Sequence, residues 1–152
     1  MAYRSGETMR LEDVDKLGIH PTAILDIGAH SGQFYGWSKR VWPIVPVFMV
    51  EANPLHEEKP HTEGNSYYKE FNYWDIPQLV QESKVTLQKL DNIFEKDAVF
   101  DIIKVDTQGS EIDILEGGKD LVSRALAVIL EVSFIEHNIG APTEQETIEY
   151  MN

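Results

Sequence analysis

One stretch decides how the fold of this chain is interpreted: Ile24-Leu25-Asp26-Ile27-Gly28-Ala29-His30-Ser31-Gly32. The apolar run from Ala23 to Ile27 predicts a buried strand that breaks into a glycine-containing turn, and a helix is expected to begin near Gly32. A second apolar run, residues 47–50, ends in Glu51. Strand, glycine turn, helix, strand and acid is the layout of a nucleotide-cofactor site.

The spacing of the glycines narrows the choice of cofactor. A dinucleotide fingerprint is G-x-G-x-x-G, whereas this chain has Asp26, Gly28 and Gly32 in the pattern D-x-G-x-x-x-G. An acid beside the loop repels a pyrophosphate and attracts a cation. S-adenosylmethionine carries a sulfonium and an ammonium group, so charge favours it over NAD. The alternative interpretation is a tight strand-to-helix turn that binds no ligand.

Two further apolar runs end in acidic residues. Residues 100–105 lead into Asp106, and residues 127–130 lead into Glu131. Between them, Ser110 is expected to cap a helix that stops at the glycine pair 117–118. Ligands of open α/β sheets bind outside the carboxyl ends of the strands. We therefore expect four acids to gather at one sheet edge: Asp26, Glu51, Asp106 and Glu131.

Taken together, these residues resemble the FkbM-type family of S-adenosylmethionine-dependent methyltransferases. The resemblance runs from Ile24 through Pro54 and from about Thr86 through Ser133. Its most specific parts are Asp26-Ile27-Gly28-Ala29-x-x-Gly32, Glu51-Ala52-Asn53-Pro54, Leu90-Asp91-x-Ile93 and Lys104-Val105-Asp106-x-x-Gly109-x-Glu111. It implies an α/β fold, a Rossmann-like class I methyltransferase sheet with helices on both faces. It also implies methyl transfer to oxygen, often on a sugar or polyketide hydroxyl.

The resemblance also assigns roles by position. The glycine loop would line the methionine part of S-adenosyl-L-methionine, Glu51 would hold its ribose, Asn53 would lie near the adenosine, and Asp106 would face the methyl-transfer centre. His30 stands where the family usually has Asn. The full set of candidate cofactor-binding residues is Asp26, Gly28, Ala29, His30, Gly32, Glu51, Asn53, Asp106 and Gln108. A branched residue in place of Gly28 is expected to abolish cofactor binding and leave the fold largely intact.

The chain departs from the family in two places. Between Glu51 and Val85 no run of branched apolar residues predicts a third parallel strand, and the aromatic stretch 66–74 is the one candidate strand there. Near the end, Thr143 and Glu146 form a capping box that opens a last helix, and the sequence stops inside that helix. We expect one domain, residues 1–152, reduced at the sheet edges and incomplete at the C-terminus. Exposed sheet edges would favour self-association.

Composition limits the remaining possibilities. The chain has 152 residues, 42% of them hydrophobic, no cysteine and a net charge of −13. The negative charge argues against nucleic-acid or anionic-membrane partners, and the lack of cysteine excludes disulfides and thiolate metal sites. The polar N-terminus shows no signal peptide and no apolar run reaches transmembrane length, so a cytoplasmic protein is expected. Trp37 and Trp42, which flank the first helix, are expected in the core.

Methyl transfer to a hydroxyl mainly requires positioning, and a general base helps. Asp106 is the first choice for the catalytic residue, with Glu131 and His30 as other candidates for the base. Capping of the following turn is an equally good interpretation of Asp106. Asp106 and a neighbouring acid could hold a divalent cation, but we favour the interpretation that these carboxylates bind no metal ion. The expected function is therefore S-adenosylmethionine-dependent O-methylation of a hydroxyl on a sugar or other small metabolite. The alternative is a catalytically inactive cofactor-binding or structural remnant of the fold.

Overall fold

The computed structural model describes residues 10–52, 69–70, 86–132 and 138–152. Its centre is a four-stranded sheet in the order β2-β1-β4-β5, and every neighbouring pair is parallel. The strands are β1 (Ile24–Ile27), β2 (Val47–Val50), β4 (Ile102–Val105) and β5 (Ala127–Leu130). All four strands match apolar runs predicted from sequence. The predicted α/β class is confirmed.

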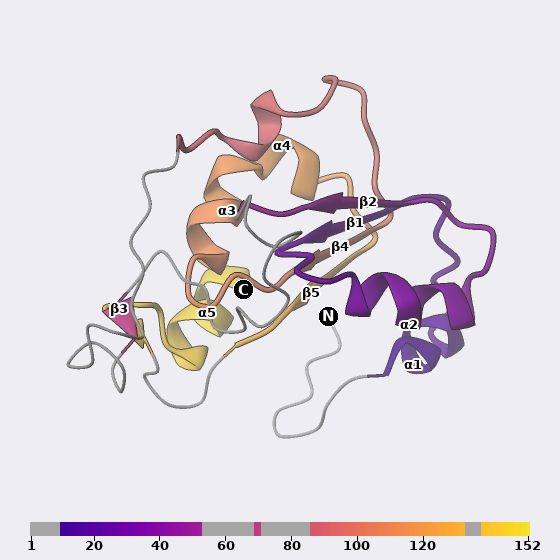
Figure 1. Cartoon of the computed structure of the whole chain (residues 1–152), viewed down its shortest axis with the longest axis horizontal. Coiled ribbons are helices and arrows are strands. Elements are labelled where there is room, and N and C mark those ends of the chain that lie inside the picture. The colour runs from indigo at the N-terminus through magenta and orange to yellow at the C-terminus, as the bar shows by residue number, and fades with distance from the viewer. Residues whose placement is uncertain (1–9, 53–68, 71–85, 133–137) are drawn as a thin grey trace.

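Helices cover both faces of this sheet (Figure 1). On one face lie α1 (Leu11–Lys16) and α2 (Gln33–Val41). On the other lie η1 (Leu90–Asn92), α3 (Glu111–Gly117), α4 (Lys119–Val122) and α5 (Glu144–Met151). The helix expected near Gly32 is α2, and the stop expected at the glycine pair separates α3 from α4.

Alternation along the two central strands divides the core into two layers. Leu25 and Ile103 face the layer that also contains Leu115 of α3 and Leu121 of α4. Their neighbours in the chain point the other way and pack against α1 and α2. The buried members of this second layer are Leu11, Val14, Ile24, Phe34, Trp42 and Ile102. Both strands are thus buried on two faces, as the strands of parallel sheets are.

A small second sheet pairs distant parts of the chain. β3 (Lys69–Glu70) runs antiparallel to β6 (Asn138–Ile139). β3 lies inside the aromatic stretch 66–74, which was the candidate strand between Glu51 and Val85. Asn53 falls outside the described residues, as do the other residues of 53–68 and 71–85.

Three local predictions have different outcomes. Trp42 is buried as expected, and its indole Nε1 donates to Asp15 Oδ1 at 2.9 Å. Trp37, however, is 53% exposed, so its placement in the core was wrong: it lies on the solvent side of α2. The capping box of α5 is present, because Thr143 and Glu146 bond each other's backbone N–H groups.

Candidate functional site

The sheet register places most of the predicted acids at one edge. Ile27 of β1 is aligned with Val50 of β2 and Val105 of β4, and Val105 with Leu130 of β5. The next residues along these strands, Gly28, Glu51, Asp106 and Glu131, therefore follow at the same carboxyl edge. Asp26 lies two positions before Gly28, inside β1, and is buried. The predicted gathering at the edge is therefore confirmed for Glu51, Asp106 and Glu131 and was wrong for Asp26, which belongs to the strand.

The glycine loop after β1 bonds its own backbone amides within the protein. Gly28 N and Ala29 N both donate to Val50 O, at 2.9 and 3.2 Å, and Gly32 N donates to Ala29 O at 2.8 Å. His30 N donates to Glu51 Oε2 at 2.9 Å. A phosphate cradle needs such amides to face the ligand. These four amides are engaged internally, so they do not form a pyrophosphate site.

Gly28 is fixed by packing as well as by its turn. Its φ is +72°, and a Cβ built there would lie 1.8 Å from the carbonyl oxygen of Asp106. No side chain fits at this distance. The expectation that a branched residue leaves the fold intact was therefore wrong, because the glycine lets the first loop touch the backbone that follows β4.

A buried lysine joins the two central strands. Lys104 Nζ lies 3.2 Å from Asp26 Oδ1 and 3.2 Å from Asp106 Oδ2, and it donates to Gly28 O at 3.3 Å. The same group lies 5.8 Å from the ring centre of Phe34. Lys104 thus neutralises charge at the point where the two loops meet.

Asp26 is completely buried, and its ion pair with Lys104 explains how it is tolerated there. Burial raises the pKa of Asp26, and the charge of Lys104 acts in the opposite direction. Its predicted part in cofactor binding stays a prediction. With no exposed surface, Asp26 would act on a ligand through Lys104.

The loop after β4 is organised around Glu111. Its Oε1 accepts from Thr107 N at 3.0 Å, Thr107 Oγ1 at 3.2 Å and Gly109 N at 3.1 Å. Ser110 occupies the N-cap position of α3, as predicted, but makes no side-chain cap bond. The Glu111 carboxylate does not replace that cap bond; it occupies a nest of loop amides before the helix, which a phosphate would otherwise use.

Asp106 contacts several other groups at the sheet edge. Gln108 Nε2 donates to Asp106 Oδ1 at 3.0 Å, while Asp106 Oδ2 pairs with Lys104. Gln108 has a φ of +55°, unusual for a residue with a side chain, and the buried Asn138 donates to its carbonyl at 2.6 Å. The side chain of Asp106 is also hydrogen-bonded to Glu131.

Glu131 has an altered acidity. Its pKa is raised to about 7, first by partial burial and then by the hydrogen bond and negative charge of Asp106. Lys104 lowers it and Glu111 raises it further. Glu131 itself lies at the exposed end of β5. The pair of carboxyl groups therefore holds one proton at slightly acidic pH.

Sequence reasoning gave no role to Lys104 or Glu111, although both fall inside the motif that carried the family resemblance. A signal for Lys104 was present. Asp26 and Lys104 occupy equivalent positions in two short buried strands, and the structure pairs them in register. Opposite charges at the third position of two neighbouring buried strands, Ile24–Ile27 and Ile102–Val105, indicate an ion pair across the strands.

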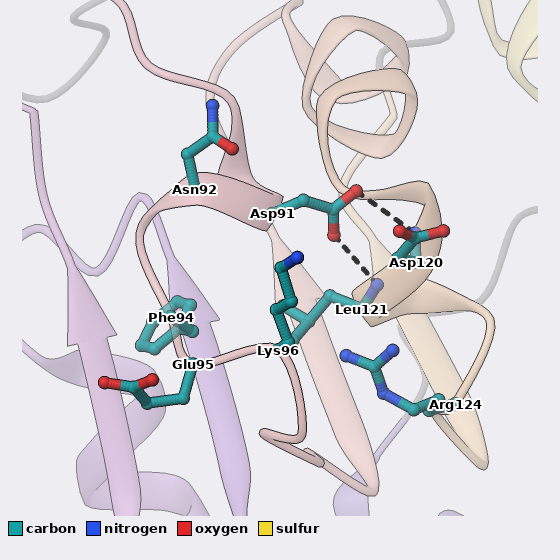
Figure 2. A pocket seen from close by; sticks show the side chains of 8 residues that line it. All are labelled: Asp91, Asn92, Phe94, Glu95, Lys96, Asp120, Leu121 and Arg124. Atoms are coloured by element: carbon teal, nitrogen blue, oxygen red, sulfur yellow. Dashed lines mark hydrogen bonds between the residues drawn. The ribbon is translucent and has the colours of Figure 1, made fainter.

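A separate hollow of about 350 Å³ lies beside η1 and α4 (Figure 2). In it Asp91 accepts hydrogen bonds from the backbone N–H groups of Asp120 and Leu121, at 3.1 and 2.9 Å. Arg124 donates to Ala98 O, and both residues precede their strands. This hollow thus adjoins the amino ends of β4 and β5, away from the acids. The motif residue Asp91 holds the start of α4 in place.

Among the residues that the structure describes, no group of three or more His, Cys, Asp or Glu side chains is placed to hold a metal ion. No helix among them has the length and apolar character needed to cross a membrane.

The parallel sheet, the helices on both faces and the acids at the carboxyl edge define a Rossmann-like methyltransferase fold. The chain matches the family model described as methyltransferase FkbM domain over residues 56–152, which is more than half of its length. It therefore belongs to the FkbM methyltransferase family. No curated protein and no solved structure matched the chain.

Proposed function

We propose that this chain is an S-adenosylmethionine-dependent O-methyltransferase that acts on a hydroxyl of a sugar or another small metabolite. Family membership supports methyl transfer. The observation that carries the choice of cofactor is the set of bonded amides in the glycine loop, together with the acids that surround it. The oxygen acceptor and the sugar rest on the family resemblance.

The residues present fit a cationic ligand better than a phosphate. Four backbone amides of the first loop are engaged within the protein, and Glu111 fills the nest of the second loop. Lys104, the cation described at this edge, is already paired with Asp26 and Asp106. Carboxylates predominate, so a sulfonium and an ammonium group would be attracted and a pyrophosphate repelled.

The roles of individual residues follow from their positions. Glu51 would hold the ribose, and the loop residues Gly28, Ala29, His30 and Gly32 would lie along the methionine part. When bound, the cofactor supplies an electrophilic methyl group. Asp106 would face the transfer centre with Gln108 beside it, and Asn53 would lie near the adenosine.

Calorimetry with S-adenosylmethionine, S-adenosylhomocysteine and NAD tests this proposal. We expect the first two to bind and NAD not to bind. Glu51→Ala should weaken binding by about 1–3 kcal/mol through loss of charge-assisted hydrogen bonds to the ribose. Glu149→Ala, which removes an exposed acid of α5, is the matched control. Binding without transfer to any hydroxyl would favour an inactive binding module, and no binding would favour a structural remnant.

We also propose that residues 1–152 form one domain that self-associates through its sheet edges. The edge strand β2 exposes Phe48 and Met49, each about half accessible. Unpaired apolar edges favour pairing with another chain. Sedimentation at several concentrations should show association, and a monomer at every concentration would contradict it.

A further inference from the structure

We propose that Glu131 is the residue that takes the proton from the acceptor hydroxyl, and that Lys104 is its positioning residue, acting through Asp106. The inference rests on the proposed function and deepens it by separating the roles of two neighbouring carboxyl groups. It starts from the contacts at the carboxyl edge of β4 and β5.

The contacts of Asp106 set it apart from Glu131. One oxygen of Asp106 accepts from Gln108 Nε2 at 3.0 Å, and the other lies 3.2 Å from Lys104 Nζ. Both oxygens thus face donors inside the protein, which is how an ionised carboxylate is held. Glu131 is hydrogen-bonded to this carboxylate from an exposed position at the end of β5.

The proton shared by the pair therefore belongs on Glu131. A neutral Glu131 carboxyl donates its O–H to Asp106, and loss of that proton leaves two adjacent carboxylates. The charged groups that face Glu131 are Asp106 and Lys104 from β4 and Glu111 from α3. Partial burial opposes the ionisation of Glu131 most, the two acids oppose it as well, Lys104 favours it, and the result is a pKa of about 7. A base with a pKa near the working pH is the most effective kind.

The proton transfer balances without any further reactant. The O–H bond of the acceptor breaks, the proton bonds to a carboxylate oxygen of Glu131, and the electron pair stays on the oxygen that becomes methylated. Glu131 then returns the proton to solvent, which its exposure permits. Asp106 keeps its contacts with Lys104 and Gln108.

Lys104 fixes this arrangement from behind the site. It is almost fully buried, lies between Asp26 and Asp106, and donates to the carbonyl of Gly28. Its ammonium group is already engaged by both carboxylates and by that carbonyl. Its effect on the reaction would therefore pass through the position and charge of Asp106.

The first test needs no cofactor. In the full chain labelled with ¹³C at the glutamate carboxyls, NMR titration should show one glutamate with a midpoint near pH 7. Glu131→Gln should remove that signal, Asp106→Asn should move the midpoint down, and Lys104→Met should move it up. Glu116→Gln and Lys119→Met, at an exposed pair elsewhere, should leave it unchanged. The inference is overturned if no glutamate titrates above pH 6 or if Asp106→Asn leaves the midpoint in place.

The second test separates this inference from the proposed function. Glu131→Gln should lower kcat about 10²- to 10³-fold, leave the Kd for S-adenosylmethionine unchanged, and abolish the rise of kcat with pH around 7. If the wild-type chain binds no S-adenosylmethionine, the proposed function fails, and the catalytic role of Glu131 with it. If it binds and methylates but Glu131→Gln keeps its kcat and pH profile, only the present inference fails.

Discussion

The two loops at the sheet edge are built in different ways. The first, between β1 and α2, is held mainly by backbone: its amides donate to Val50 O and Ala29 O, and Gly28 packs against the chain after β4. The second, between β4 and α3, is held mainly by side chains, above all Glu111 and Gln108. The family model covers the second loop and not the first, since its match begins at residue 56.

The stability of the first loop therefore depends on backbone geometry and on the small size of Gly28. The stability of the second loop depends on the identity of its side chains, above all Glu111.

Gly28→Ala should be the most damaging change, at more than about 4 kcal/mol of unfolding free energy, because its Cβ would meet the carbonyl of Asp106 at 1.8 Å. Gly32→Ala is the matched control. Gly32 also has a positive φ, of +79°, but its Cβ would have 3.7 Å to the nearest atom, so it should cost only about 1–2 kcal/mol. Urea unfolding measures both. Equal losses would show that turn strain alone explains Gly28.

Lys104→Met should cost about 3–5 kcal/mol, because it leaves Asp26 buried without its counter-ion. The double variant Asp26→Asn with Lys104→Met should recover much of that loss, which a thermal or urea unfolding cycle would detect. Lys119→Met, at an exposed ion pair, should change stability little. Losses that simply add in the double variant would contradict the pairing that links the two loops.

Glu111→Ala should destabilise the chain by about 2–3 kcal/mol, since three donors of the second loop lose their acceptor. Glu51→Ala removes the acceptor of His30 N at an exposed position and should cost about 1 kcal/mol or less. Denaturant midpoints compare the two variants directly. A larger loss of unfolding free energy for Glu51→Ala than for Glu111→Ala would contradict the view that side chains hold mainly the second loop.

The dependence of stability on pH should also reveal the contact between Glu131 and Asp106, the first residue of the second loop. Glu131 has an ordinary pKa of 4.5 when unfolded and about 7 when folded, so between these values the folded state binds the extra proton. The contribution of Glu131 to the free energy of unfolding is therefore fully present below pH 4.5 and is lost as the pH rises through about 7. Comparing the wild type with Glu131→Gln isolates this slope. Identical pH profiles of stability for the wild type and Glu131→Gln would show that Glu131 does not contribute to this dependence.

Several features could be predicted from sequence because their causes are local. Short apolar runs between turn residues predicted the four parallel strands, and two glycines marked the first loop. The capping box that opens α5 needs residues only three positions apart. The convergence of Glu51, Asp106 and Glu131 followed from a general rule, since parallel strands bring their carboxyl ends to one edge.

Contacts between distant strands were decided by the tertiary structure. The ion pair of Asp26 with Lys104 and the contact of Gly28 with Asp106 depend on the register of β1 against β4, which no single segment contains. The raised pKa of Glu131 depends in the same way on the placement of β5 beside β4. Sequence by itself determined the strands, the turns and the class of fold. The assembled sheet alone decided which charges meet, because register fixes their distances and burial fixes the strength of their interaction.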